Sequence, residues 1–485
     1  DFSHYADYFN HMEDENIVQA IPNAKASEWM EENIPLFECP QHNFEEMYYY
    51  RWWSIRKHIK ETPVGYGMTE FLVQRSYSDK YNLIACAIGH HIYESRWLRD
   101  PKYLDQIIHT WYRGNDGGPM KKMDKFSSWN ADAVLARYMV DGDKDYLLDM
   151  KKDLETEYQR WERTNRLKNG LYWQGDVQDG MEESISGGRR KKYARPTINS
   201  YMYGNAKALS CIGILSGDEG MAMKYGMRAD TLKNLVENEL WNTRHQFFET
   251  MRTDSSANVR EAIGYIPWYF NLPDTTQKYE IAWKEIMDEK GFSAPYGLTT
   301  AERRHPEFRT RGVGKCEWDG AIWPFASAQT LTAMANFMNN YPQTVLSDSV
   351  YFRQMELYVE SQYHRGRPYI GEYLDEVTGY WLKGDQERSR YYNHSTFNDL
   401  IITGLIGLRP RLDNTIEVNP LIPADKWDWF CLDNVLYHGH NLTILWDKNG
   451  DRYHCGKGLR IFVDGKEVGQ ADTLTKIICE NALKW

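Results

Sequence analysis

Paired helical segments constrain the fold of this chain more than any other feature of its sequence. From about residue 43 to residue 408, apolar residues recur at the spacing of three to four that is typical of amphipathic helices. The segments come in pairs, joined by short turns that contain Gly, Pro or Asp. In the first pair, residues 82–93 precede residues 102–112, and Pro101 suits the first turn of the second helix. Similar pairs are 127–140 with 143–162, 199–215 with 218–238, 257–270 with 275–288, and 321–339 with 347–362.

Further helices are expected near residues 43–60 and 394–406. Together the segments make roughly six hairpins, or about twelve helices, which is the number a closed ring of helical hairpins needs. The pairs do not repeat with a strict period, so a regular solenoid array is not expected. The pattern therefore predicts a mainly α-helical fold, an (α/α)6 barrel.

After Pro410 the sequence changes to short alternating runs that are typical of strands. Asn449-Gly450 and Asp464-Gly465 indicate two-residue hairpins, because both central residues of a type I′ turn need a positive φ. We expect an N-terminal extension (1–42) packed on the barrel, a catalytic barrel (43–409) and a small C-terminal β domain (410–485). The alternative is a single domain in which the strands only decorate the barrel. The expected strands are 415–418, 429–437, 442–446, 459–463 and 476–479.

Charge and composition exclude several kinds of partner. The chain has 58 Lys and Arg against 69 Asp and Glu, a net charge of −11 that repels a phosphate backbone, so we expect no nucleic acid partner. No stretch of about 20 residues is apolar enough to span a bilayer. Aromatic residues make up 14% of this acidic chain. Stacking faces combined with carboxylates are typical of grooves that bind polar, uncharged ligands, and sugars fit that description.

The cysteines and the start of the chain bear on cofactors and location. Seven cysteines without a C-x-x-C pair exclude zinc knuckles and a complete disulfide framework. No glycine fingerprint for a nucleotide is present, so we expect no required cofactor and no catalytic metal, while a structural calcium ion stays open. The chain begins at Asp1 without a methionine, which favours an exported protein, periplasmic or extracellular, over a trimmed chain. We expect a monomer or a weak homo-oligomer.

Three glycine-rich loops, at 172–188, 315–324 and 371–381, concentrate charge and aromatic rings between good helices. Ordering a loop costs conformational entropy and buries little surface, so such side chains indicate function. Each loop also has a structural explanation. The first is a solvated acidic turn, the second carries core tryptophans, and the third is an ordinary turn beside a surface acid. The three together are harder to explain by packing alone.

In this order on a body of helical hairpins, the three loops resemble those of (α/α)6 glycoside hydrolases related to family 63, the mannosylglycerate-hydrolase-like and trehalase-like group. In that group a loop of the type S-G-M-D-N-S carries the general acid, and residues 179–184 (DGMEES) resemble it. A W-x-G-P-x-W element lines the sugar subsite, and residues 318–323 (WDGAIW) are similar, with Ala321 in place of the proline. A last element begins E-Y and ends T-G, as residues 372–379 do, and it carries the general base.

The resemblance implies that Glu182 is the general acid and Glu372 the general base of an inverting glycoside hydrolase. A water molecule would then lie between base and sugar, with the two carboxyl groups about 6.5–9.5 Å apart. The acid position holds Glu where the family has Asp, so Asp179 and Glu183 stay as reserve candidates. By analogy, the enzyme would act from the end of a plant or microbial oligosaccharide, in polysaccharide degradation.

Other side chains of these loops are candidates for binding the sugar. Flat aromatic faces suit the apolar side of a pyranose ring, and polar groups suit its hydroxyls. For each aromatic ring a position in the core is equally open. The aromatic candidates are Trp173, Trp318, Trp323, Tyr373 and Trp381, and the polar candidates are Arg195, Asn199, Glu317 and Asp319.

Two other classes of protein remain as alternatives. A polysaccharide lyase of the helical-toroid type would need a Tyr or His base with an Arg or Lys, and its product would be unsaturated. A non-catalytic carbohydrate-binding protein would keep the aromatic residues without turnover. His90, His91 and Glu94 share a helical segment, which we interpret as an ordinary helix because no third metal ligand is placed nearby.

Overall fold

A ring of inner helices forms the body of the computed structural model, which describes residues 2–276 and 278–484. Within these residues each inner helix contacts the next one along the chain, and the last contacts the first, so the ring is closed. The inner helices are α4 (Ile88–Ser95), α6 (Asn130–Asp141), α9 (Pro196–Ser216), α11 (Ile266–Tyr269), α12 (Pro324–Asn340) and α14 (Phe397–Asp399), which continues as a π-helix over Leu400–Leu405.

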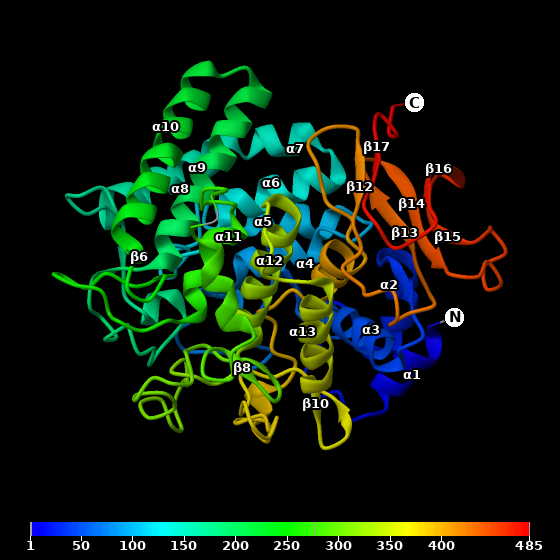
Figure 1. The fold of residues 1–485 in the computed structure, drawn as a ribbon, viewed down its shortest axis with the longest axis horizontal. Coiled ribbons are helices and arrows are strands. Elements are labelled where there is room, and N and C mark those ends of the chain that lie inside the picture. Colours follow the sequence, from blue (N-terminus) through cyan, green and yellow to red (C-terminus); the bar gives the residue numbers. More distant parts are fainter. Residues whose placement is uncertain (1, 277, 485) are drawn as a thin grey trace.

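A second layer of helices surrounds the ring, and the two layers together form the predicted (α/α)6 barrel (Figure 1). Each outer helix precedes an inner one in the chain. Among the described residues, no helix is both long and apolar enough to cross a membrane. The outer helices are α3 (His42–Lys57), α5 (Lys102–Arg113), α7 (Lys144–Asp149) with α8 (Lys151–Asn165), α10 (Glu219–Leu235), the 3-10 helix Glu280–Ile286 and α13 (Asp348–Ser361).

The fourth hairpin is shorter than the sequence pattern predicts. The expected helix at 257–270 is reduced to a 3-10 turn, Ala262–Tyr265, followed by α11. Asn271 adopts a left-handed φ of 54°, and Pro273 follows, so the helix cannot continue. The expected partner at 275–288 contains only the 3-10 helix Glu280–Ile286, and residue 277 lies outside the described residues.

The C-terminal part is a β domain that packs beside the barrel. The sheet order is β1-β13-β14-β15-β16, and β12 pairs separately with β17. Neither β1 nor β16 was predicted from the sequence. These strands are β1 (Leu36–Glu38), β12 (Ile416–Val418), β13 (Trp429–Tyr437), β14 (His440–Asp447), β15 (Gly458–Val463), β16 (Lys466–Ala471) and β17 (Ile477–Cys479).

Of the two predicted hairpin turns, one is confirmed and one is wrong. Asp464 and Gly465 join β15 to β16 with φ values of 49° and 82°, as a type I′ turn requires. Asn449-Gly450 instead begins a longer loop, because β14 ends at Asp447. The Asp447 carboxylate accepts hydrogen bonds from the backbone N–H groups of Gly450, Arg452 and Tyr453. These bonds fix the conformation of the longer loop in place of a two-residue turn.

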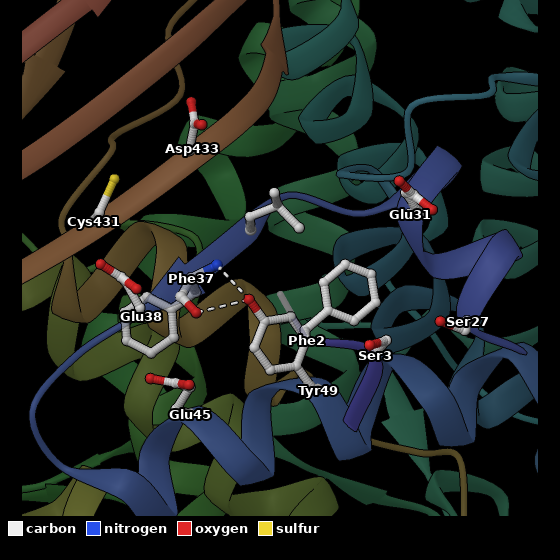
Figure 2. A pocket seen from close by; sticks show the side chains of 11 residues that line it. Phe2, Ser3, Ser27, Glu31, Phe37, Glu38, Glu45, Tyr49, Cys431 and Asp433 are labelled. Atoms are coloured by element: carbon white, nitrogen blue, oxygen red, sulfur yellow. Dashed lines mark hydrogen bonds between the residues drawn. The ribbon is translucent and has the colours of Figure 1, made fainter. Parts of the chain in front are cut away.

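The N-terminal extension connects the barrel to the β domain, and both termini lie at this side of the molecule (Figure 1). Helix α1 (Ser3–Asn10) packs on α3, and β1 pairs with β13. Figure 2 shows the cavity of about 660 Å³ that remains between these parts. Phe2 stacks on Tyr49 there, with ring centroids 5.1 Å apart. The Tyr49 hydroxyl donates to the Phe37 carbonyl and accepts from the Phe37 N–H, so this side chain fixes β1.

Aromatic side chains fill the axis of the ring. The Trp129 side chain is fully buried, and the His90 ring meets it edge-on, with centroids 4.9 Å apart. His90 also meets Phe325 edge-on, and Trp129 lies against Tyr201. No cluster of three His, Cys, Asp or Glu side chains that suits a metal ion occurs in the described ranges. Because the aromatic rings fill the axis, a ligand can enter the barrel only from one of its two mouths.

Gly89 is the position where this packing is tightest, and it gives a test of the inner ring. A Cβ atom at residue 89 would lie 2.1 Å from a ring carbon of Trp129. We expect Gly89→Ala to lower the free energy of unfolding by about 1–3 kcal/mol, because the core is overpacked. The matched control is Gly220→Ala in α10, where the nearest atom is 3.6 Å away and we expect no loss. Equal stability of both variants in urea unfolding would contradict the packing.

Candidate active site

The three loops singled out in the sequence meet at one mouth of the barrel. Each lies before an inner helix, namely α9, α12 and α14, and these helices belong to one ring. The first and second loops are linked through Arg311, which donates its side chain to the Ile185 carbonyl at 2.9 Å and its backbone N–H to Asp319 in the second loop. The second and third loops are joined by a pair of backbone hydrogen bonds between Ile322 and Leu374. Carboxyl groups 190 positions apart in sequence are thereby brought to one place.

Asp179 holds the first loop from inside. Its carboxylate has no exposed surface and accepts hydrogen bonds from Ser127 at 2.6 Å, from Arg195 Nε at 2.7 Å and from Thr197 at 2.5 Å. Both oxygens of this carboxylate are engaged with side chains of the protein, and neither faces an open space. The structure thus gives Asp179 a positioning role.

Arg195 and Asn199 were predicted to bind sugar hydroxyls, and the structure corrects this. Both side chains are fully buried. Arg195 pairs with Asp179, and the Asn199 amide donates to the carbonyls of Tyr172 and Arg195 while its oxygen accepts from the Tyr172 N–H. These contacts fix the loop to α9, and neither side chain has exposed surface for a ligand.

Glu182 and Glu183 separate at a sharp turn of the chain. Glu183 adopts a left-handed φ of 68° and forms an ion pair with Arg189. Glu182 has no ion-pair partner in the part of the chain that the structure describes. Burial, the largest cause, together with the charges of Glu372 and Asp176, raises the pKa of Glu182 to about 7. Glu182 is therefore a carboxyl group that keeps its proton near neutral pH.

Glu372 is also buried, but its charged neighbours are cations, whereas those that raise the pKa of Glu182 are acids. Its side chain is 6% exposed, and burial raises its pKa. Lys383 Nζ lies 3.6 Å from its Oε2, and the positive charges of Lys383 and Arg388 counteract that rise. The Cys316 thiol donates to its other oxygen at 3.8 Å. Cations beside Glu372 favour its ionised form, while Glu182 is kept neutral.

The aromatic candidates are packed against one another, which favours the core position over the sugar-facing one, the two alternatives that the sequence left open. Trp318 stacks on Trp323, and Trp323 stacks on Tyr373, both with centroids 4.6 Å apart. These three rings are at most 3% exposed. Trp381 is also buried, and its indole N–H donates to the carbonyls of Ser361 and Tyr363. Trp173 is half-buried, with Lys192 Nζ 4.5 Å above its ring.

Glu317 and Asp319 were also predicted to bind hydroxyls, and they instead hold the second loop. Asp319 is fully buried, and one of its oxygens accepts from the backbone N–H groups of Arg311 and Gly312. Glu317 is 3% exposed and pairs with Arg309 at 3.3 Å. Both carboxylates brace the loop that carries Cys316 and the stacked tryptophans.

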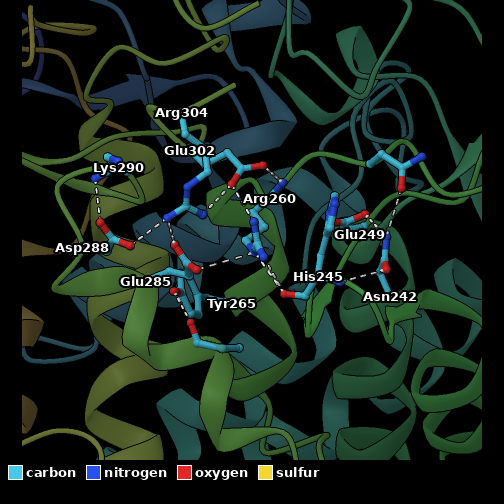
Figure 3. A network of polar contacts seen from close by, with 12 residues as sticks. Asn242, His245, Glu249, Arg260, Tyr265, Glu285, Asp288, Lys290, Glu302 and Arg304 are labelled. Carbon is cyan, nitrogen blue, oxygen red and sulfur yellow. Dashed lines mark hydrogen bonds and ion pairs between the residues drawn. The ribbon is translucent and has the colours of Figure 1, made fainter. Parts of the chain in front are cut away.

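A network of charges surrounds Arg260, next in the chain to a contact of the first loop; Figure 3 shows the network itself. Arg260 binds Glu302 at 2.8 Å, and Arg304 joins Glu302 to Glu285 and Asp288. Glu261, which follows Arg260 in the chain, accepts a hydrogen bond from the Ser186 N–H of the first loop at 3.3 Å. This network thus fixes the segment against which the acidic loop ends.

Sequence reasoning missed several groups that the fold brings to the site. Glu70 lies in the electrostatic neighbourhood of both Glu182 and Glu372, and Cys86 and His394 contact it. Lys383 reaches Glu372 from a segment without any motif. Only the position of an acid directly before an apolar run, in Glu70-Phe71-Leu72-Val73, hinted at Glu70, and nothing in the sequence linked it to the loops.

The buried pair of Asp179 and Arg195 gives a stability test of this arrangement. We expect Asp179→Asn to lower the free energy of unfolding by about 3–5 kcal/mol, because Arg195 is left buried without its counter-charge. The matched control is Glu183→Gln, whose partner Arg189 is 58% exposed, with an expected loss below about 1 kcal/mol. If denaturant unfolding gave the same small loss for both, Asp179 would not be the anchor of the loop.

Comparison with known proteins agrees with this architecture. The model of the mannosylglycerate hydrolase MGH1-like glycoside hydrolase domain matches residues 80–395. The model of the C-terminal domain of glycosyl hydrolase family 65 matches residues 408–469, in the β domain.

Solved structures with the same fold include both near and distant relatives. A protein named sialidase is 95% identical and covers 99% of this chain at a TM-score of 0.99, but this chain spans only 44% of that protein. A family 63 mannosylglycerate hydrolase from Thermus thermophilus, in complex with glucose, is 12% identical at a TM-score of 0.54, over 73% of this chain and 99% of that one. A family 78 rhamnosidase from Bacillus sp. GL1 is 10% identical at 0.60, over 88% and 41%. At such identities the last two show the fold alone.

Proposed function

The chain belongs to the mannosylglycerate hydrolase MGH1-like glycoside hydrolase family, and from this premise we propose that it is an inverting, exo-acting hydrolase with Glu182 as general acid and Glu372 as general base. The observation that carries the proposal is the pair of carboxyl groups with raised pKa values at one mouth of the barrel, of which only Glu372 has a cation, Lys383, as an ion-pair partner among the described residues.

Hydrolysis with inversion needs two carboxyl groups in opposite protonation states. One protonates the leaving oxygen, and the other takes a proton from the attacking water on the opposite face of the sugar. Glu182, with a pKa of about 7, holds the proton that the leaving group needs. Glu372, where the charges of Lys383 and Arg388 counteract the rise in pKa that burial causes, is the group that we assign to accept the proton of the water. The surroundings of Glu182 thus suit the general acid, and those of Glu372 suit the general base.

The two reserve candidates fit the role of the acid less well. Both oxygens of Asp179 accept hydrogen bonds, from Ser127, Arg195 and Thr197, and its side chain has no exposed surface to meet a leaving group. Glu183 is engaged with Arg189. The extra methylene of Glu182, compared with the Asp of the family pattern, is compatible with the short loop that follows Gly180, which itself needs a left-handed φ of 72°.

Exo action is supported by the filled axis of the barrel. Trp129, His90 and Phe325 occupy the centre, so a chain cannot pass through, and only an end of an oligosaccharide can enter the mouth. We propose a glycoside at the end of a plant or microbial oligosaccharide as the substrate class. Family membership favours hydrolysis over the lyase reaction, which needs no matched acid and base carboxyl pair.

The first kinetic test concerns the base. We expect Glu372→Gln to lower kcat by at least about 10³, because a positioned general base and a negative charge beside the cation-like transition state are lost together. Activity is first located by screening the wild-type chain against chromogenic glycosides. The matched control is Glu376→Gln, at an equally buried acid of the same loop that pairs with Arg309. Turnover of Glu372→Gln near the wild-type value would remove Glu372 from the mechanism.

The second kinetic test concerns the acid and its proton. Because Glu182 must be protonated, activity should fall as the pH rises through about 7, the pKa of this carboxyl group. Glu182→Gln should remove this basic limb and spare an activated aryl glycoside, whose leaving group needs little protonation, while it cripples a natural linkage. A basic limb that persists in Glu182→Gln, or the same leaving-group dependence in Asp179→Asn alone, would move the assignment to another residue.

A further inference from the structure

A third carboxyl group lies beside the catalytic pair, and the mechanism above does not use it. Glu70 follows β3 (Gly65–Met68), and its residue is only 4% exposed. The charges of Glu372 and Glu182 both act on it, which places it in the same cluster. A buried carboxyl group is costly unless it is hydrogen-bonded, so its partners indicate its role.

The partners of Glu70 come from the segments that precede two different inner helices. Cys86, just before α4, donates its thiol hydrogen to Oε2 at 3.6 Å. His394, just before α14, places its Nδ1 3.3 Å from Oε1. The main chain of Glu70 is also tied to this second segment, because its carbonyl accepts from the Asn393 N–H at 3.0 Å. Glu70 thus spans the point where the ring closes.

Each partner leads on to one of the catalytic loops. On one side, a Cβ atom at Gly180 would lie 3.4 Å from Cys86 Sγ, so Cys86 supports the acidic loop two residues before Glu182. On the other side, His394 packs on Tyr392 with ring centroids 4.1 Å apart. The Tyr392 N–H donates to the Ile370 carbonyl, two residues before Glu372.

From this geometry we propose that Glu70 is a positioning residue of the catalytic site, whose carboxyl group bridges Cys86 and His394 and so fixes the separation of Glu182 and Glu372. The inference rests on the proposed function, because it assigns Glu70 to that same site. A bridge of this kind needs hydrogen bonds and shape, and it needs no charge.

The surroundings of Glu70 favour the uncharged form. Burial first, then the charges of Glu372 and Glu182, raise its pKa. Of the other titratable groups that face it, Cys86 and Tyr392 have raised pKa values and stay neutral, and the buried His394 has a lowered pKa and is neutral too. Tyr77, which faces the same cluster, has a raised pKa as well. A glutamine side chain therefore matches both the shape and the charge of Glu70.

The kinetic experiment compares Glu70→Gln with Glu70→Ala on the glycoside that the wild-type chain hydrolyses. We expect Glu70→Ala to lower kcat by about 10²-fold with KM changed by less than about threefold, since a small misplacement of reacting groups has effects of that size. Glu70→Gln should stay within about threefold of the wild type, with both limbs of its pH profile unmoved. The inference is overturned if Glu70→Gln is as impaired as Glu70→Ala, or if Glu70→Ala keeps full turnover.

A matched control separates positioning from general stability. Glu157 is also buried, with 9% of its surface exposed, and it accepts hydrogen bonds from Tyr112 and from the Asn130 amide, away from the loops. Glu157→Ala should lower Tm but leave the kcat of the folded enzyme unchanged. Cys86→Ala breaks the same bridge from its other side, so it should lower kcat even if Glu70→Ala fails to fold. Unchanged turnover in Cys86→Ala would count against the bridge.

A measurement without substrate keeps the two proposals apart. The alkylation rate of Cys86 by iodoacetamide is followed by peptide mass spectrometry in the wild type and in the Glu70 variants. We expect at least about a tenfold faster reaction in Glu70→Ala and a wild-type rate in Glu70→Gln and in Glu157→Ala. If the wild type hydrolyses no glycoside, the proposed function fails while this readout still tests the bridge. An unchanged rate in Glu70→Ala would overturn the inference.

Discussion

The closure of the inner ring depends on a buried polar seam between its first and last helices. Both carboxylate oxygens of Glu94, on α4, accept from the backbone N–H groups of Asn398 and Asp399 at the start of α14, at 3.1 and 2.6 Å. Arg96 and Trp97 in turn donate to the Asp399 carboxylate at 2.8 and 2.7 Å. All these side chains are nearly fully buried. A buried charge without its partner is strongly destabilising, so the seam defines one arrangement of the two helices.

The catalytic mouth depends on the same seam. His91 lies on α4 one turn before Glu94, and its Nε2 is 2.7 Å from the Asn393 carbonyl. This contact fixes the segment that carries His394. Since Glu70 bonds to Asn393 through its main chain and contacts His394, the closing segment and the site are one unit. The α4 segment with His90, His91 and Glu94 therefore has a structural part in the closure of the ring. Its polar groups join the ends of the barrel, while His90 fills the axis against Trp129 and Phe325.

The sequence predicted those parts of the fold that follow from local periodicity. Amphipathic helices in pairs identified the barrel, and Asp464-Gly465 identified a hairpin because its backbone conformation is local. The short fourth hairpin was overestimated, since apolar residues continue past the point where Asn271 and Pro273 end the helix. Strand β1 could not be found, because three residues gain their conformation from pairing with β13, about 400 positions away.

In the candidate site, too, local sequence pattern predicted some features, and others depend on contacts between distant segments. Glu182 and Glu372 stand in loops with a recognisable pattern, and the fold brings them into one cluster. The roles of their neighbours depend on burial, which a loop pattern does not reveal. Arg195, Asn199 and Asp319 have the chemistry to bind hydroxyls, yet each is fully buried with internal partners. Trp318 and Trp323 have suitable faces, yet they cover each other. Glu70 gains its neighbours only from the closure of the ring.

The central claim is that two carboxyl groups act on opposite faces of the sugar with a water molecule between them. It is tested most directly by the anomeric configuration of the first product, followed by proton NMR before mutarotation on the glycoside that the enzyme hydrolyses. The account predicts a product of the opposite anomeric configuration to the substrate. A product that retains the configuration of the substrate would contradict it, because retention requires a covalent intermediate on one of the two groups.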